Sequence, residues 1–220
     1  MYNTILFDLD GTLTDSEPGI INSIEYALKK YGIEMENKAD LRKFLGPPLK
    51  ESFKQICGFS EEKAEQAVEF YREYFRERGI FENTVYEGVV ELLEVLKVQN
   101  KKLIVATSKP EPFTYRILEH FDLLKYFDFV AGSNMDNTRC KKDEVIAHAL
   151  NSCGITDLQS VVMIGDREHD IIGANKVGIA SIGVLYGYGD LQELETAGAT
   201  YIAKNTHEIY KIVTTNIIGE

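Results

Sequence analysis

Short apolar runs rich in β-branched residues alternate with helical patterns along most of this chain. The runs are Thr4 to Leu9, Leu103 to Thr107, Phe129 to Ala131, Val161 to Gly165, Ala180 to Leu185 and Tyr201 to Ala203. Helical patterns follow at Gly88 to Gln99, Glu111 to His120, Asp143 to Cys153, Ile171 to Val177 and Leu191 to Ala197. Continuous apolar runs are typical of strands buried on both faces, and their alternation with helices is typical of a parallel sheet. We therefore predict an α/β fold with a doubly wound, Rossmann-like parallel-sheet core.

The alternation is interrupted once, after the first apolar run, by roughly ninety residues without a convincing strand. A helical apolar stripe begins there after Ser16 and Pro18, with Ser16 as a candidate helix cap, and stops at Gly32. The patterns after it predict helices over Leu41 to Leu45, over Leu49 to Cys57, and from an N-cap at Ser60 to a stop at Gly79. We therefore predict an all-helical cap subdomain over residues 17–83, inserted into a core of residues 1–16 and 84–220.

The composition narrows the class of partner. The 220 residues include 24 Lys and Arg against 35 Asp and Glu, a net charge of −11, so a nucleic-acid polymer or an anionic membrane is a poor partner. No run approaches the ~20 apolar residues of a membrane span. Asp8 and Asp10 interrupt any signal-like run near the N-terminus. Cys57, Cys140 and Cys153 are odd in number and have no C-x-x-C spacing, which indicates neither a disulfide framework nor a zinc site. We expect a cytoplasmic protein with a small-molecule partner.

Polar residues follow the predicted strands at their carboxyl ends, where open parallel sheets bind ligands. The first strand leads into Asp8-Leu9-Asp10-Gly11, the second into Thr107-Ser108-Lys109, and the fourth into Gly165-Asp166 and then Asp170. Lys141 and Lys142 precede the helix before the fourth strand. Thr107 and Ser108 offer hydroxyl or backbone N–H groups and Lys142 offers a positive charge, which are the groups that a bound phosphate requires.

The acidic residues form two closely spaced pairs. Asp8 and Asp10 are two apart at a strand end, so both turn to one side, and their repulsion raises one pKa unless a divalent cation holds both ionised. Asp166 and Asp170 are four apart at a helix start and face one side of it. Oxygen ligands without His or Cys select Mg²⁺. Each pair alone is also explained by an Asx turn or a helix cap; their conjunction with the hydroxyls and the lysine favours a phosphate site.

The order Asp8-x-Asp10-Gly11-Thr12, then Thr107, Lys142 and Gly165-Asp166-x-x-x-Asp170 resembles the haloacid-dehalogenase-like (HAD) phosphohydrolases. The resemblance spans nearly the whole chain, includes the inserted helical cap, and is strongest to the phosphoglycolate phosphatase and 5′-nucleotidase group. It implies a Mg²⁺-dependent phosphatase that hydrolyses a small phosphorylated metabolite of the phosphoglycolate or nucleoside 5′-monophosphate type, and a sugar phosphate or pyrophosphate remains open as the substrate.

The same resemblance implies a role for each residue. Asp8 would be the nucleophile that forms an aspartyl-phosphate, and Asp10 would protonate the leaving oxygen and later activate water. Thr107 would hydrogen-bond the phosphoryl group, and Lys142 would neutralise its charge, with adjacent Lys141 as the alternative. Mg²⁺ would be held by Asp8, the Asp10 backbone carbonyl and Asp166, with Asp170 binding directly or through water.

The cap is expected to close over the site and contact the leaving group. Candidate substrate-binding residues in it are Arg42, Lys43 and Gly46 of the Gly46-Pro47-Pro48 loop. A Gly-Pro-Pro break between two short helices also needs no ligand to explain it.

Particular residues argue for or against the other activities that share these motifs. Dehalogenases of the family lack the second motif carboxylate, so Asp10 argues against carbon–halogen cleavage. Sugar phosphomutases keep both aspartates but usually carry a His shortly after them, and none follows Asp15 before Pro18, which favours hydrolysis over mutation. Receiver domains also use acidic residues, a Thr and a Lys around an aspartyl-phosphate, which would make the chain a phospho-accepting regulatory protein without turnover. They place the phosphoacceptor late in the chain, whereas here the Asp pair ends the first strand.

Overall fold

The structure is a computed structural model that describes residues 1–35, 37–45, 48–136 and 138–215. The chain divides into two compact units, which we call unit 1 (Met1–Asp15 with Val85–Glu220) and unit 2 (Ser16–Thr84). The division predicted from the sequence lies one residue away at each boundary. Within the described residues, no helix combines the length and the apolar character that crossing a membrane requires.

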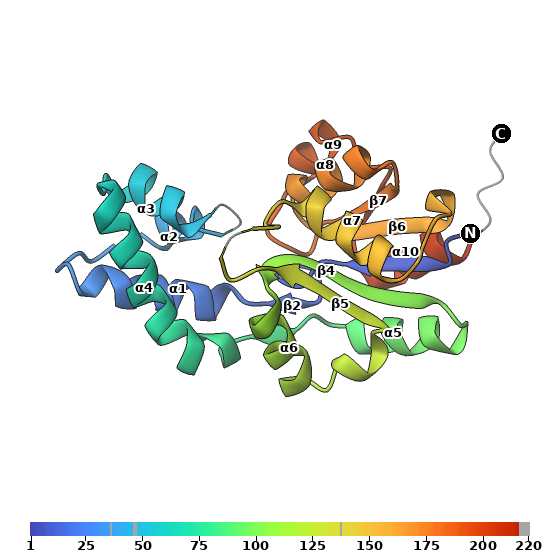
Figure 1. The fold of residues 1–220 in the computed structure, drawn as a ribbon, viewed down its shortest axis with the longest axis horizontal. Coiled ribbons are helices and arrows are strands. Elements are labelled where there is room, and N and C mark those ends of the chain that lie inside the picture. Colours follow the sequence, from blue (N-terminus) through green and yellow to red (C-terminus); the bar gives the residue numbers. More distant parts are fainter. Residues whose placement is uncertain (36, 46–47, 137, 216–220) are drawn as a thin grey trace. The chain divides into compact units, whose positions relative to one another are not determined.

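Unit 1 is built on a six-stranded sheet with the order β5-β4-β1-β6-β7-β8, in which every neighbouring pair is parallel (Figure 1). Its strands are β1 (Thr4–Phe7), β4 (Lys102–Pro110), β5 (Phe129–Ser133), β6 (Val161–Gly165), β7 (Ala180–Val184) and β8 (Tyr201–Ala203). All six predicted strands are present, and the α/β class with a parallel Rossmann-like sheet is confirmed.

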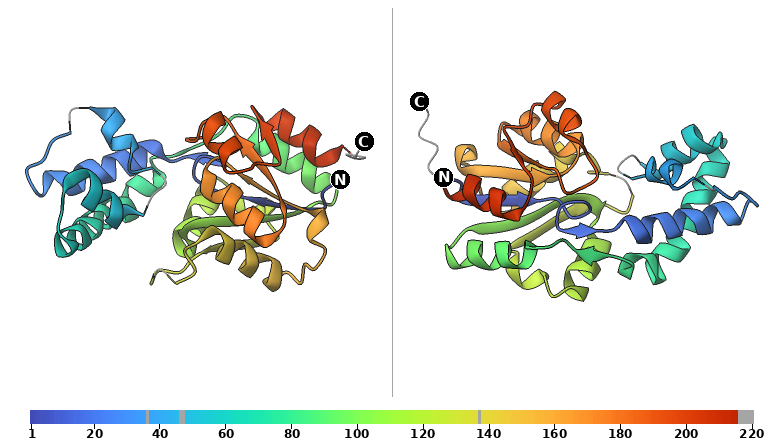
Figure 2. Two further views of the ribbon diagram at one scale, coloured as in Figure 1. Left: turned by 90° about the horizontal axis from the view of Figure 1, so that it is seen from above. Right: turned by 180° about the vertical axis from the view of Figure 1, so that it is seen from behind.

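Helices cover both faces of this sheet (Figures 1 and 2). They are α5 (Val89–Val98), α6 (Glu111–His120), α7 (Lys142–Ser152), α8 (Glu168–Val177), α9 (Leu191–Thr196) and α10 (Thr206–Thr214). On one face, Val145 and Ala149 of α7 and Ala174 of α8 pack with Leu6 and Met163 in a single buried core. Strand β1 is buried along its whole length, as expected for a central parallel strand.

The strand order places β1 between β4 and β6. Asp8 therefore follows the central strand, and Asp166 follows its neighbour β6. Strand β4 continues to Pro110, beyond the predicted end at Thr107. After a shift in register that follows Ala106, it pairs with β5 again at Pro110 and Ser133. The carboxyl ends of three adjacent strands thus deliver Asp8, Thr107 and Asp166.

Unit 2 consists mainly of α1 (Glu17–Lys29), α2 (Lys38–Arg42), α3 (Leu49–Cys57), α4 (Glu61–Glu77) and a 3₁₀ turn, Gly79–Phe81. Its interior is apolar and aromatic, and Phe44 and Phe53 meet edge to face with ring centroids 5.2 Å apart. The two-residue strands β2 (Thr14–Asp15) and β3 (Thr84–Val85) form a separate two-stranded sheet that the sequence did not predict.

The helices of unit 2 test the helix caps and helix bounds that were predicted from the sequence. The Ser60 hydroxyl accepts the Lys63 N–H at 3.3 Å and caps α4, as predicted. The Ser16 side chain does not cap α1, because its backbone at ψ 4° is not extended. The helix expected over Leu41 to Leu45 instead spans Lys38–Arg42. It is followed by a turn in which the Leu45 N–H donates a hydrogen bond to the Arg42 carbonyl. Gly46 and Pro47 lie outside the described residues.

Candidate active site

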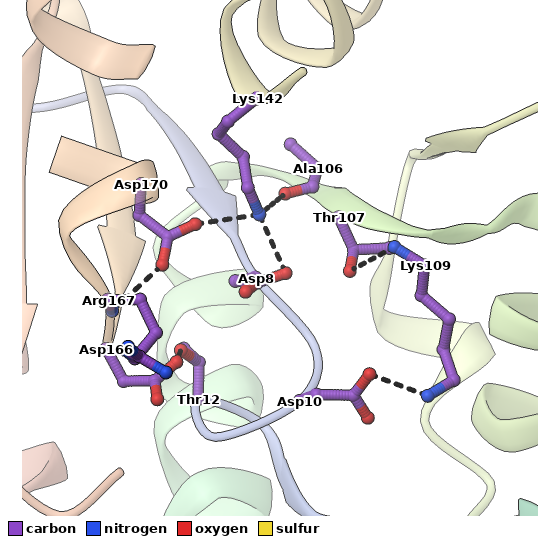
Figure 3. Close-up of polar contacts among 10 residues, drawn as sticks. All are labelled: Asp8, Asp10, Thr12, Ala106, Thr107, Lys109, Lys142, Asp166, Arg167 and Asp170. Atoms are coloured by element: carbon purple, nitrogen blue, oxygen red, sulfur yellow. Dashed lines mark hydrogen bonds and ion pairs between the residues drawn. The ribbon is translucent and has the colours of Figure 1, made fainter. Parts of the chain in front are cut away.

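The structure brings the predicted polar residues of unit 1 together at the carboxyl ends of β1, β4 and β6 (Figure 3). Asp8 directly follows β1, Thr107 lies near the end of β4, and Asp166 directly follows β6. Lys142 opens α7, and Asp170 lies in the first turn of α8. Side chains from five separate segments therefore meet at one edge of the sheet.

Lys142 is the electrostatic centre of this cluster. Its Nζ lies 2.9 Å from Asp8 Oδ1 and 2.7 Å from Asp170 Oδ1, and it donates a hydrogen bond of 3.1 Å to the Ala106 carbonyl. The side chain is 4% exposed. Burial by itself lowers the pKa of Lys142, but the two carboxylates outweigh burial and raise it, so the ammonium stays charged. Lys141, the alternative in the sequence, is exposed.

Asp166 is completely buried and held by two hydrogen bonds. The Thr12 hydroxyl donates to Oδ1 at 3.2 Å, and the Tyr188 N–H donates to Oδ2 at 2.8 Å. Burial raises the pKa of Asp166 well above its usual range, and the nearby Asp170 and Asp8 carboxylates raise it further. Asp170 is held similarly, because its Oδ2 accepts the Arg167 N–H at 3.1 Å.

The carboxylates fit a hard divalent cation. Asp8, Asp166 and Asp170 each offer an oxygen within 4.8 Å of the other two, and oxygen ligands alone suit Mg²⁺. Burial, reinforced by Asp170 and opposed by Lys142, raises the pKa of Asp8 to about 6. With Asp10 included, four carboxylates face two ammonium groups, Lys142 and Lys109. Full ionisation therefore leaves two negative charges in excess, which a divalent cation balances.

Asp10 carries a partner that the sequence analysis did not assign. Lys109 Nζ lies 2.6 Å from Asp10 Oδ2, and the lysine side chain is 7% exposed (Figure 3). Asp10 Oδ1 is buried and accepts no hydrogen bond from any residue that the structure describes. Lys109 is two residues after Thr107 on the same strand, and this period-two spacing is the signal that could have found it.

The remaining predicted residues are placed as follows. Ser108 is exposed between Thr107 and Lys109. Arg42 belongs to unit 2, where its side chain is 66% exposed and its Nε lies 2.6 Å from Glu17 Oε1. Lys43 pairs with Asp40 at 2.6 Å, and Gly46 lies outside the described part of the chain. Contact of these cap residues with a leaving group stays a prediction.

A family model described as haloacid dehalogenase-like hydrolase matches residues 5–184, a range that includes Asp8, Asp10, Thr107, Lys109, Lys142, Asp166 and Asp170. The chain belongs to the haloacid dehalogenase-like hydrolases. The resemblance inferred from the sequence motifs is confirmed, and so is the prediction that the chain is an enzyme of the hydrolase type.

Individual proteins and solved structures are similar to this chain over nearly its whole length. A 5′-nucleotidase of Pseudomonas aeruginosa is 46% identical over 91% of this chain and 90% of its own length. Tyrosine-protein kinase PtkA of Mycobacterium tuberculosis is 37% identical over 90% of this chain and 67% of its own. The crystal structure of a predicted phosphatase from Clostridium acetobutylicum has a TM-score of 0.91 at 49% identity, covering 97% of this chain and 98% of that one.

Proposed function

We propose that this protein is a Mg²⁺-dependent phosphomonoester hydrolase that acts through an aspartyl-phosphate on Asp8. The observation that carries the proposal is the contact of Asp8 with the buried ammonium of Lys142, beside Asp166 and Asp170. A carboxylate nucleophile must approach a phosphate dianion, and it does so only where positive charge offsets the repulsion. The family relationship and the similarity to a 5′-nucleotidase support the same reaction class.

In the first half-reaction, an Asp8 carboxylate oxygen attacks phosphorus and the bond from phosphorus to the leaving oxygen breaks. Asp10 enters this step protonated and gives its proton to that oxygen, so the alcohol leaves neutral and Asp10 becomes the carboxylate that pairs with Lys109. In the second, Asp10 takes a proton from water, whose oxygen attacks phosphorus and releases Asp8 and inorganic phosphate. Lys142 stays protonated and contacts phosphoryl oxygens, and the Thr107 hydroxyl hydrogen-bonds the same group.

Asp8, the Asp10 backbone carbonyl, Asp166 and Asp170 would hold the Mg²⁺. When bound, the cation supplies the positive charge that binds phosphoryl oxygens beside a carboxylate nucleophile. Support for this assignment comes from the oxygen-only donor set and from the excess negative charge of the cluster.

The substrate class that we favour is a small phosphorylated metabolite of the nucleoside 5′-monophosphate type, with phosphoglycolate as the alternative. The support is the 46% identity to the 5′-nucleotidase over nearly its full length. We further propose that unit 2 is the cap and that Arg42, together with Lys43 and Gly46, contacts the leaving group. We also propose that the protein is cytoplasmic.

A second candidate is transfer of the phosphoryl group from Asp8 to a tyrosine hydroxyl of a protein. The 37% identity to Tyrosine-protein kinase PtkA favours it. The two candidates share the aspartyl-phosphate and differ in the acceptor of the second half-reaction, which is water for the hydrolase and an alcohol for the transferase. A phospho-accepting regulator and a sugar phosphomutase would share with the hydrolase only the first half-reaction, in which Asp8 becomes phosphorylated.

The test is release of inorganic phosphate from a panel of nucleoside 5′-monophosphates, phosphoglycolate and sugar phosphates, with Mg²⁺ or with EDTA. Wild type is compared with Asp8→Asn and with Asp122→Asn, a matched control because Asp122 is a highly exposed carboxylate paired with Lys125. Turnover that needs Mg²⁺, is lost in Asp8→Asn and is kept in Asp122→Asn is expected. An inactive wild type across the panel, with a phosphorylated tyrosine appearing on an added protein, would favour the transferase.

A further inference from the structure

The loop that follows β7 holds Asp166 through its backbone. We call residues 185–190 the β7 loop. The Tyr188 N–H donates to Asp166 Oδ2 at 2.8 Å, while the Thr12 hydroxyl donates to Oδ1 at 3.2 Å. A carboxylate oxygen accepts two hydrogen bonds or ligands, so each oxygen keeps capacity for a cation. The two donors fix the plane of the carboxylate.

Two glycines bring this loop close enough to make that contact. A Cβ at Gly187 would collide with the Cβ of Asp166 and the Gly11 carbonyl oxygen, and one at Gly189 would collide with the Asp166 carbonyl oxygen. Neither glycine has a positive φ, so an alanine is compatible with the backbone conformation at both positions. Glycine is required at both positions because Asp166 and its neighbours leave no room for a Cβ atom.

Two tyrosines fasten the β7 loop to the segment that follows β1. The Tyr186 hydroxyl donates to the Thr12 carbonyl at 3.0 Å, and the Tyr188 hydroxyl donates to Asp15 Oδ1 at 3.1 Å. The Tyr186 ring also meets the Tyr86 ring, with centroids 5.0 Å apart. The segment after β1 carries Asp8, Asp10 and Thr12. The loop is therefore tied to the same segment that supplies the other side of the site.

We propose that the β7 loop is a positioning element that sets the Asp166 carboxylate for a divalent cation, with Gly187 and Tyr188 as positioning residues. The inference rests on the proposed function, because it takes Mg²⁺ as the ligand of Asp166. Partners that orient a metal ligand change metal affinity by about 10–100-fold when they are removed. The β7 loop accordingly controls how tightly the cation binds. A substitution in this loop is expected to leave the residues that contact substrate in place.

The experiment measures Mg²⁺ affinity by calorimetric titration of the metal-free full chain, with no substrate present. Gly187→Ala is expected to weaken Mg²⁺ binding by about 10–100-fold, and saturating Mg²⁺ is expected to restore kcat. The control is Gly154→Ala, at a left-handed glycine with φ +64° where a Cβ meets nothing. It lies past the far end of α7 from Lys142, so it costs stability without displacing Asp166, and its Mg²⁺ affinity is expected to match wild type.

The possible results distinguish a failure of the positioning role of the β7 loop from a failure of the proposed function. A folded Gly187→Ala with wild-type Mg²⁺ affinity, or a Gly154→Ala weakened equally, overturns the positioning role while the proposed function stands. A wild type that binds no Mg²⁺ in the titration overturns the metal assignment and this inference with it. If Gly187→Ala does not fold, Tyr188→Phe takes its place: it keeps the N–H, loses the hydrogen bond to Asp15, and is expected to weaken Mg²⁺ about tenfold.

Discussion

Lys109 Nζ and Asp10 Oδ2 lie 2.6 Å apart in a largely buried ion pair within unit 1. The pair engages one oxygen of Asp10, while the other, Oδ1, is buried and accepts no hydrogen bond within the described residues. The backbone N–H of Lys109 donates to the Thr107 hydroxyl at 3.2 Å, which ties the lysine to a second residue of the site. Lys109 thus fixes the rotamer of the residue that we propose as the proton donor.

Lys109→Met is expected to lower kcat about 10–100-fold, because Asp10 loses the contact that orients it for proton transfer. KM is expected to change little, since the substrate phosphate is assigned to Lys142 and Thr107. Steady-state kinetics on a phosphomonoester in saturating Mg²⁺ measures both constants. Lys109→Arg keeps the charge and is the matched variant, expected to retain most of kcat. Equal losses in the Met and Arg variants would contradict an orienting ion pair.

Lys142→Met is expected to remove activity and to lower the free energy of unfolding by about 3 kcal/mol, because it leaves the buried Asp8 and Asp170 without their cation. Urea denaturation in EDTA measures the stability change. Lys141→Met is the control, because Lys141 is the exposed neighbour and surface substitutions usually stay within about 0.5 kcal/mol. Loss of activity in Lys141→Met with activity kept in Lys142→Met would reverse the assignment of the phosphate-binding lysine.

The strands of unit 1 were predictable because they are buried on both faces, so that runs such as Val161 to Gly165 stand out as continuous apolar segments. Helix α10 was missed although Asn205 caps it by accepting the Glu208 N–H at 3.0 Å. Its Asn-x-x-Glu start is a recognisable helix signal. Its two buried residues, Ile209 and Val213, are four apart, so the helical spacing was also present in the sequence.

The site residues were predictable in so far as their chemistry lies in local motifs, as for Asp8 with Asp10 and Asp166 with Asp170. The roles of Gly187 and Tyr188 were not, because both depend on Asp166, which is about twenty residues away and packs against them only in the folded chain. Lys109 was visible two residues after Thr107, but its ion pair joins β4 to Asp10, which lies 99 residues earlier in the chain. Such contacts follow from strand order, which local patterns leave undetermined.

Metal removal is expected to destabilise the protein as well as inactivate it. A cation that binds only the folded state at 100 times its Kd raises the free energy of unfolding by about 2.7 kcal/mol. Thermal unfolding in Mg²⁺ and in EDTA measures this. Asp166→Asn removes a carboxylate charge from the cluster and is expected to show a much smaller Mg²⁺-dependent shift in Tm. A shift as large as that of wild type would place the cation elsewhere.

Asp128 provides a pH-dependent part of the stability that is independent of the active site. Partial burial raises the pKa of Asp128, but the hydrogen bond from the Leu103 N–H at 2.9 Å and the Lys97 ammonium at 3.0 Å outweigh it and lower the pKa. Because the folded pKa lies below the unfolded value of about 3.9, the contribution is fully present above that value. It is lost as the pH falls through the folded pKa.

Asp128→Asn keeps an acceptor for the Leu103 N–H and removes the charge. At pH 7 it is expected to be less stable than wild type by about 0.5–1 kcal/mol, in the range of a partly exposed ion pair. The difference is expected to shrink toward zero as the pH falls from 4 to 2. Urea unfolding midpoints of both proteins across this range provide the measurement. A stability gap that stays constant on acidification would show that Asp128 acts through packing, because only an ionised carboxylate makes the gap depend on pH.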